Sequence, residues 1–167
     1  QMPNSPVVFW SFPAIYKIGA IAVPMNPLLR PEQAAYIFRN SGARVAITSP
    51  EFAPWVIAAQ KQAPELKHVI CTEKTDVTGT TGYDSLVQGQ PDSLKIAETD
   101  NEDLAAIIYT AGTTGPSKGV MHTHYSLYAT AAGYADFVLR YRCTTLEVTS
   151  SMFDVRTHKL VKTHQKV

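Results

Sequence analysis

The chain contains little cysteine, little net charge and few charged side chains for its length. Its 167 residues include two cysteines, Cys71 and Cys143, too few for a disulfide framework or a cysteine-rich metal site. The net charge is +1, so the composition does not predict binding to nucleic acid or to a charged membrane surface. Reduced, structural cysteines are therefore expected, and they are compatible with a cytoplasmic protein.

No long apolar run is free of interruption. The stretch from Pro6 to Met25 carries a single charge, at Lys17, and is also broken by Pro13. We therefore predict a buried helix over residues 6–18 and a short buried strand over 20–24, and no transmembrane segment. The start of the chain shows no basic region or small-residue cleavage pattern of a secretory leader. We expect a cytoplasmic location; a peroxisomal or membrane-peripheral one fits the same pattern.

Helical and strand patterns alternate along most of the chain. Such alternation predicts an α/β fold with a mainly parallel sheet and helices on both faces, whose ligands bind beyond the carboxyl ends of the strands. Pro31 marks the first turn of one helix, and the Ser41-Gly42 pair marks its end. Pro54 is compatible only with the first turn of the next helix. Further helices are expected over residues 31–39, 51–62 and 123–139, with a helical turn at 83–88. Further strands are expected over residues 44–48, 67–72, 104–110 and 118–122, with a loop at 73–82.

The most informative segment runs from Tyr109 to Gly119 and reads Tyr-Thr-Ala-Gly-Thr-Thr-Gly-Pro-Ser-Lys-Gly. It holds three glycines, three threonines, a serine and one lysine. Glycine lets the backbone approach a ligand closely, and successive N–H groups can form a concave anion site. Hydroxyl groups add donors, and Lys118 adds a mobile positive charge. The composition predicts a loop that holds the phosphates of a nucleotide; a glycine-rich turn without a ligand is the plainer alternative.

The Walker A loop is the obvious comparison, but its pattern does not match. It needs Gly, four residues, then Gly-Lys-Ser/Thr at the start of a helix. Counted from Gly112, Ser117 stands where the second glycine belongs, and Gly119 stands where the hydroxyl belongs. The following residues, 119–123, read as a strand. Strand, loop, strand is therefore predicted, and an unrelated Walker-type NTPase is disfavoured.

This loop resembles the signature of the AMP-forming adenylating enzymes, Thr-Ser-Gly-Thr-Thr-Gly-x-Pro-Lys-Gly followed by Val and a Thr-His pair. That family includes acyl-CoA synthetases, 4-coumarate–CoA ligases and luciferases. Two positions depart from it, Ala111 for Ser and Ser117 for Pro, so no side-chain role is assigned to residue 111. The resemblance covers about residues 3–139 and includes Asn26-Pro27 and the Ser41-Gly42-Ala43-Arg44 segment.

The resemblance implies a fold, a reaction and a set of site residues. The fold would be part of the large N-terminal domain of an AMP-forming ligase. The reaction would activate a carboxylate, such as a fatty or aryl acid, as acyl-AMP with ATP and Mg²⁺, and then transfer it to coenzyme A. Lys118 would neutralise phosphate charge. The nucleotide phosphates would be held by Thr110, Gly112, Thr113, Thr114, Gly115 and Lys118.

The two ends of the chain differ in character from its middle. The family has a strand before this starting point, so the N-terminus is expected to be cut. Residues 1–140 are expected to form a partial AMP-binding domain, and 141–167 a divergent tail, either frameshifted or disordered. The last twelve residues, Arg156 to Val167, hold four Lys or Arg, two His and no acid. Without interleaved aromatic residues we expect no nucleic-acid contact there.

Several motifs of the resembling family are not found in the sequence. Its Thr-Glu segment, which supplies the Mg²⁺ ligand, and its ribose-binding Thr-Gly-Asp are both missing, so the glutamate ligand is expected outside this chain. The chain alone is therefore expected to be inactive, and an inactive nucleotide-binding or interaction module remains the alternative. No metal site is predicted: His122 and His124 are two residues apart, a spacing that on a strand puts both on one face, but further ligands are lacking.

Overall fold

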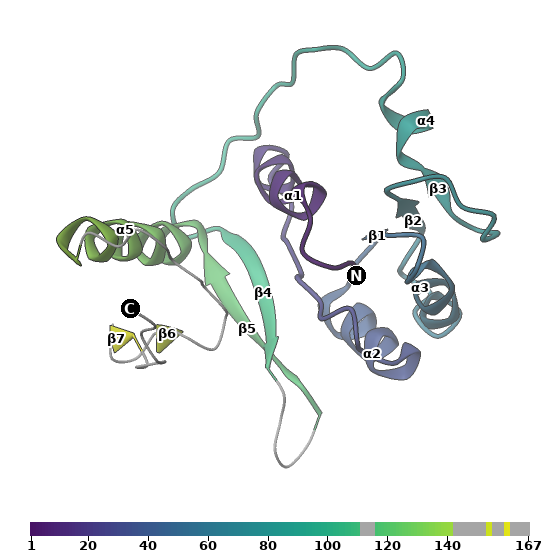
Figure 1. The fold of residues 1–167 in the computed structure, drawn as a ribbon, viewed down its shortest axis with the longest axis horizontal. Coiled ribbons are helices and arrows are strands. Elements are labelled where there is room, and N and C mark those ends of the chain that lie inside the picture. The colour runs from purple at the N-terminus through teal and green to yellow at the C-terminus, as the bar shows by residue number, and fades with distance from the viewer. Residues whose placement is uncertain (111–115, 142–152, 155–158, 161–167) are drawn as a thin grey trace. The chain divides into compact units, whose positions relative to one another are not determined.

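The computed structural model describes residues 1–110, 116–141, 153–154 and 159–160. The chain divides into two compact units, Gln1–Thr123 and His124–Val167. Figure 1 labels their helices and strands along the chain. The helices are α1 (Pro6–Lys17), α2 (Pro31–Ser41), α3 (Ala53–Gln60), α4 (Tyr83–Val87) and α5 (His124–Tyr141). The strands are β1 (Val45–Thr48), β2 (His68–Cys71), β3 (Thr81–Gly82), β4 (Leu104–Thr110), β5 (Lys118–Thr123), β6 (Phe153–Asp154) and β7 (Lys159–Leu160).

A parallel sheet of order β1-β2-β3 confirms the predicted α/β class. Strands β1 and β2 pair in register from Val45↔His68 to Thr48↔Cys71. Strand β3 lies inside the segment expected to be a loop, and it pairs with the last two residues of β2. Its two residues, threonine and glycine, carry no strand periodicity, so this pairing depends on the neighbouring strand rather than on local sequence.

One face of this sheet forms the core of the first unit. Burial alternates along β1 and β2, with Ala46 and Val69 inward, as expected for a strand with one face packed. Helices α2 and α3 contact each other, and α3 also contacts both strands; Figure 1 draws α3 beside them. Phe38 of α2 and Val56 of α3 complete the packing, and Val56 is fully buried.

Local chemistry explains where the helices begin and end. The Ser5 hydroxyl accepts a hydrogen bond from the Val8 amide at the start of α1. Pro31 occupies the first turn of α2, where its missing amide hydrogen costs nothing. Gly42 ends α2 in the left-handed conformation, with φ of 67°, which glycine adopts without steric cost.

The strand expected over residues 20–24 is reduced to one bridge. Ala22 pairs in parallel with Ala106 of β4. The Ala22 amide donates to the Ala105 carbonyl at 2.8 Å, and the Ile107 amide donates to the Ala22 carbonyl at 2.9 Å. Pro24 has no amide hydrogen with which to continue the ladder. The strand prediction was wrong in extent, although the segment does align with β4.

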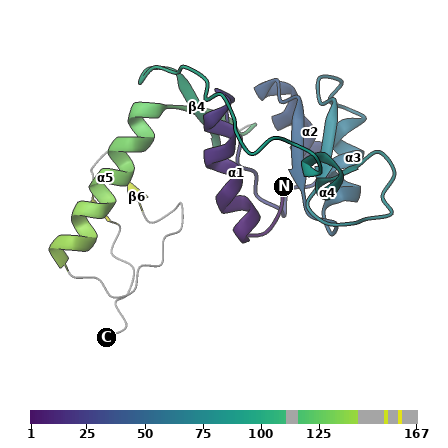
Figure 2. The same ribbon diagram turned by 90° about the horizontal axis from the view of Figure 1, so that it is seen from above.

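The second unit contains α5 and the short antiparallel pair β6 and β7. Figure 2 shows α5 as one continuous helix. An exposed ion pair joins Arg140 to Asp136 one turn earlier, at 2.8 Å, and such surface pairs contribute little to stability. Across the described ranges, no helix has both the length and the apolar character needed to cross a membrane.

Candidate functional site

The glycine-rich segment is flanked by strands β4 and β5, which confirms the two strands predicted on either side of it; the two strands form an antiparallel hairpin. Strands β4 and β5 pair from Leu104↔Thr123 to Thr110↔Lys118, and Figure 1 shows them as adjacent arrows. Strand β4 is apolar, and its residues Ala105 and Ala106 are buried. Because β4 also pairs with Ala22 on its other side, the hairpin is anchored to the first unit rather than isolated.

Two of the predicted site residues form the end of the hairpin stem. Thr110 and Lys118 are directly opposite each other, and both are exposed. The Thr110 hydroxyl lies 3.5 Å from the Lys118 carbonyl, a distance at which a hydrogen bond is weak. Lys118 makes no ion pair with any described residue, so its ammonium is available to an anion from solvent.

The remaining predicted site residues fall outside the described part of the chain. These are Gly112, Thr113, Thr114 and Gly115. Their role stays a prediction, and the described part of the candidate site is the stem on either side of them.

Sequence reasoning missed why Gly119 is glycine. Gly119 is directly opposite Tyr109. A Cβ atom placed at residue 119 would lie 2.7 Å from Ile107 Cγ2 and 3.1 Å from Tyr109 Cζ. Carbon atoms in contact are normally about 3.5–4.0 Å apart, so only glycine leaves room for the Tyr109 ring at this point of the stem.

Helix α2 contributes two polar contacts to the stem that the sequence did not reveal. The Tyr109 hydroxyl donates to Asn40 Oδ1 at 2.6 Å. The Tyr36 hydroxyl donates to the Ser117 carbonyl at 3.1 Å. Desolvation, followed by the nearby Tyr36, raises the pKa of Tyr109, while a hydrogen bond with Ser41 opposes the shift. Tyr109 therefore stays neutral, and its hydroxyl remains a donor at physiological pH.

The two closely spaced histidines do not share a strand face. His122 belongs to β5, but β5 ends at Thr123 and His124 is the first residue of α5. Strand alternation therefore does not extend to His124, in agreement with the strand expected over residues 118–122 and the helix expected over 123–139. No group of three or more His, Cys, Asp or Glu side chains within the described segments could hold a metal ion.

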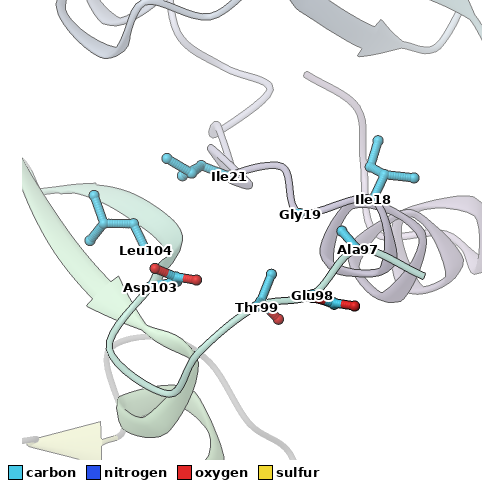
Figure 3. A pocket seen from close by; sticks show the side chains of 8 residues that line it. All are labelled: Ile18, Gly19, Ile21, Ala97, Glu98, Thr99, Asp103 and Leu104. Atoms are coloured by element: carbon cyan, nitrogen blue, oxygen red, sulfur yellow. The ribbon is translucent and has the colours of Figure 1, made fainter. Parts of the chain in front are cut away.

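A hollow of about 500 Å³ lies elsewhere in the first unit, and Figure 3 shows the side chains around it. It combines apolar side chains such as Ile18 and Leu104 with the carboxylates of Glu98 and Asp103. Leu104 is the first residue of β4 and Thr110 the last, a separation of about 20 Å along a strand. Two carboxylates would repel phosphate, so this hollow is not the site for a nucleotide's phosphates.

Comparison with known proteins identifies relatives over most of the chain. A family model described as AMP-binding enzyme matches residues 1–159. Crotonobetaine/carnitine–CoA ligase from Escherichia fergusonii is 36% identical over 131 residues, which cover 76% of this chain and 25% of the relative. The chain thus spans about a quarter of the length of the curated relatives it matches.

Solved structures show the same relationship. The anthranilate CoA ligase AuaEII, solved in complex with anthranoyl-AMP, has a TM-score of 0.73 and 34% identity, and the match covers 78% of this chain and 25% of that one. A benzoate CoA ligase from Burkholderia xenovorans LB400 has a TM-score of 0.68 and 27% identity, with 81% and 25% covered. The fold described above is therefore shared with the corresponding part of these ligases.

Proposed function

This chain belongs to the family of AMP-binding enzymes, and on that premise we propose that it forms part of an ATP-dependent, AMP-forming ligase. The ligase would activate a carboxylic acid and join it to a thiol. The similar proteins are named as CoA ligases for crotonobetaine or carnitine, anthranilate and benzoate. Their names support coenzyme A as the thiol and an aryl acid as one candidate carboxylate. A fatty acid is the other candidate, because a fatty acyl CoA synthetase from Mycobacterium tuberculosis is also similar, at 32% identity.

The observation that carries the proposal is the hairpin stem. Thr110 and Lys118 face each other where β4 ends and β5 begins, and the glycine- and threonine-rich segment lies between them. The whole hairpin, residues 104–123, contains no Asp or Glu. An exposed lysine, several hydroxyl groups and an absence of carboxylates suit a polyanion such as triphosphate.

In the proposed reaction, a carboxylate oxygen attacks the α-phosphorus of ATP and the bond to the β-phosphate oxygen breaks. Acyl-AMP forms and pyrophosphate leaves. A thiol sulfur then attacks the acyl carbon, a thioester forms, and AMP leaves. Charge accumulates on the leaving pyrophosphate, so donors held near its β- and γ-phosphates lower the barrier.

The residues of this chain would hold that leaving group. The Lys118 ammonium would supply positive charge, which is mobile and strongly hydrated in lysine. The other proposed donors are the hydroxyls of Thr110, Thr113 and Thr114 and the backbone N–H groups of residues 112–115. The hairpin offers Mg²⁺ hydroxyl oxygens but no carboxylate, and the described residues contain no cluster of metal ligands. The donors of the hairpin and of the other described residues therefore do not fit a resident Mg²⁺ site by themselves.

Calorimetric titration of the chain with ATP tests the proposal. We expect Lys118→Ala to weaken binding by about 10- to 100-fold, as for the loss of a charge-assisted hydrogen bond. Lys61→Ala is the matched control, because Lys61 is an exposed lysine at the end of α3, outside the hairpin. Equal affinity of the wild type and Lys118→Ala for ATP would contradict the role of Lys118.

The products distinguish the proposed chemistry from a Walker-type reaction. A ligase that contains this segment should convert ATP to AMP and pyrophosphate when a carboxylic acid is present. Release of ADP and inorganic phosphate would instead indicate an NTPase and would refute the proposed reaction.

A further inference from the structure

Tyrosine hydroxyls link helix α2 to the hairpin stem at two points, one in β4 and one at the residue just before β5. Tyr109 leads into the loop on β4 and donates to Asn40 Oδ1 at 2.6 Å. Ser117 leads out of the loop, and its carbonyl accepts from the Tyr36 hydroxyl at 3.1 Å. Tyr36 and Asn40 are four residues apart in α2, a spacing that places them on one helix face. One face of one helix therefore holds both sides of the stem.

We propose that Tyr36 and Tyr109 are positioning residues for the phosphate loop, which deepens the proposed function and rests on it. Neither hydroxyl is assigned a contact with phosphate. Tyr36 acts through the Ser117 carbonyl, one residue before Lys118. Tyr109 acts through the backbone of β4, one residue before Thr110. Together they fix the positions of Thr110 and Lys118, the two stem residues proposed to contact the nucleotide.

The stem needs such support because its own end is weakly held. A two-stranded hairpin is marginally stable alone. At the end of the stem, Thr110 and Lys118 pair with each other, and no other strand of the described residues pairs with them there. The cross-strand contact there, from the Thr110 hydroxyl to the Lys118 carbonyl, spans 3.5 Å. Two shorter hydrogen bonds to α2 restrict the stem before the ligand arrives. Such preorganisation strengthens binding by reducing the entropy lost when the ligand is bound.

The contact also accounts for the glycine at position 119. Gly119 lies across from Tyr109, and a side chain at residue 119 would collide with the Tyr109 ring and with Ile107. The absence of a Cβ atom lets the ring lie across β5 while its hydroxyl contacts Asn40. The last glycine of the motif therefore makes room for the positioning contact.

The test removes each hydroxyl and leaves its ring in place. ATP titrations of the 167-residue chain compare the wild type with Tyr36→Phe, Tyr109→Phe and the double variant. Tyr83→Phe is the matched control, since Tyr83 is a half-exposed tyrosine of α4. All titrations are made at a temperature where circular dichroism shows every variant folded. Amide hydrogen exchange at residues 118 and 119 is measured on the same proteins without nucleotide.

We expect each single variant to bind ATP about threefold to tenfold more weakly, the effect of one net hydrogen bond. Amide exchange at residues 118 and 119 should become faster, and Tyr83→Phe should match the wild type in both measurements. Wild-type affinity in both tyrosine variants would overturn the proposal. If the wild type does not bind ATP, the proposed function fails for this chain. Amide hydrogen exchange at residues 118 and 119 then tests the positioning contact by itself. Faster exchange in the variants then supports the positioning contact, and unchanged exchange overturns it.

Discussion

Replacing Gly119 by alanine should destabilise the first unit through steric overlap in the hairpin stem. The added Cβ would lie 2.7 Å from Ile107 Cγ2 and 3.1 Å from Tyr109 Cζ, against normal carbon contacts of about 3.5–4.0 Å. The Ile107 atom is part of a β-branched side chain, which cannot move without rotating about χ1. Overpacking of this kind costs about 1–3 kcal/mol.

A smaller effect acts in the opposite direction. Alanine has fewer unfolded conformations than glycine, which stabilises a folded chain by about 0.4–1 kcal/mol where the backbone permits it. The net prediction for Gly119→Ala is therefore a loss of about 1–2 kcal/mol in the free energy of unfolding. Urea unfolding monitored by circular dichroism measures this loss as a lower midpoint.

Two further variants identify the cause of the loss. Gly82→Ala makes the same chemical change in the same unit, at a residue with φ of −71° whose nearest neighbouring atom is 4.0 Å from the added Cβ. This control should not lower the free energy of unfolding and should raise it by at most about 1 kcal/mol. Ile107→Ala removes the closest atom, so in the Ile107→Ala/Gly119→Ala double variant the two losses should not add. A Gly119→Ala protein as stable as the wild type, or strictly additive losses, would refute the steric argument.

Three other predictions follow from the packing, the α2 terminus and the tyrosine contacts. Val56→Ala should cost about 2 kcal/mol in urea unfolding because Val56 is fully buried, whereas the exposed Val87→Ala should cost less than about 0.5 kcal/mol; equal losses would contradict the core assignment. Gly42→Ala should lower the free energy of unfolding by about 1–2 kcal/mol, because residue 42 has φ of 67°, a left-handed conformation that alanine adopts at a cost. An added Cβ would have no atom within 4 Å, so backbone strain is the cause of this loss. A neutral result would show that the left-handed cap is not required. Desolvation raises the pKa of Tyr109 in the folded chain. The neutral Tyr109 side chain should therefore stabilise the fold fully below about pH 10, the ordinary pKa of tyrosine. This stabilisation should be lost as the pH rises through the raised pKa of the folded state. An absorbance titration of the wild type minus Tyr109→Phe should show a tyrosine that ionises above the ordinary value, and an ordinary value would contradict its desolvation.

The local sequence was sufficient for features whose causes are local. The apolar start of residues 104–110, the glycine-rich segment and the strand pattern of residues 118–122 correctly predicted β4 and β5, although the antiparallel pairing of these two strands was not predicted. Proline and glycine at the ends of α2 predicted its limits to within two residues at most. The loop signature also led to the family later matched over residues 1–159, because the order of so many glycine, threonine and lysine residues is highly specific.

Other features depended on residues far apart in the chain. The two tyrosine contacts of the stem join residues separated by 69 and 81 positions, and no local pattern marks Tyr36 or Asn40 as partners of the loop. Strand β3 exists because Cys71 and Ile70 offer it an edge, and the strand expected at 20–24 is limited to the bridge at Ala22.

The sequence by itself determined the α/β class, the two strands beside the glycine-rich segment and the chemical character of the candidate phosphate loop, because periodicity, turn residues and donor groups are properties of neighbouring residues. Only the tertiary structure decided how that hairpin is held. It brought Tyr109 over Gly119 and placed Tyr36 against the Ser117 carbonyl. The physical reason is that hydrogen bonds and steric contacts act over a few ångströms in space, whatever the separation along the chain.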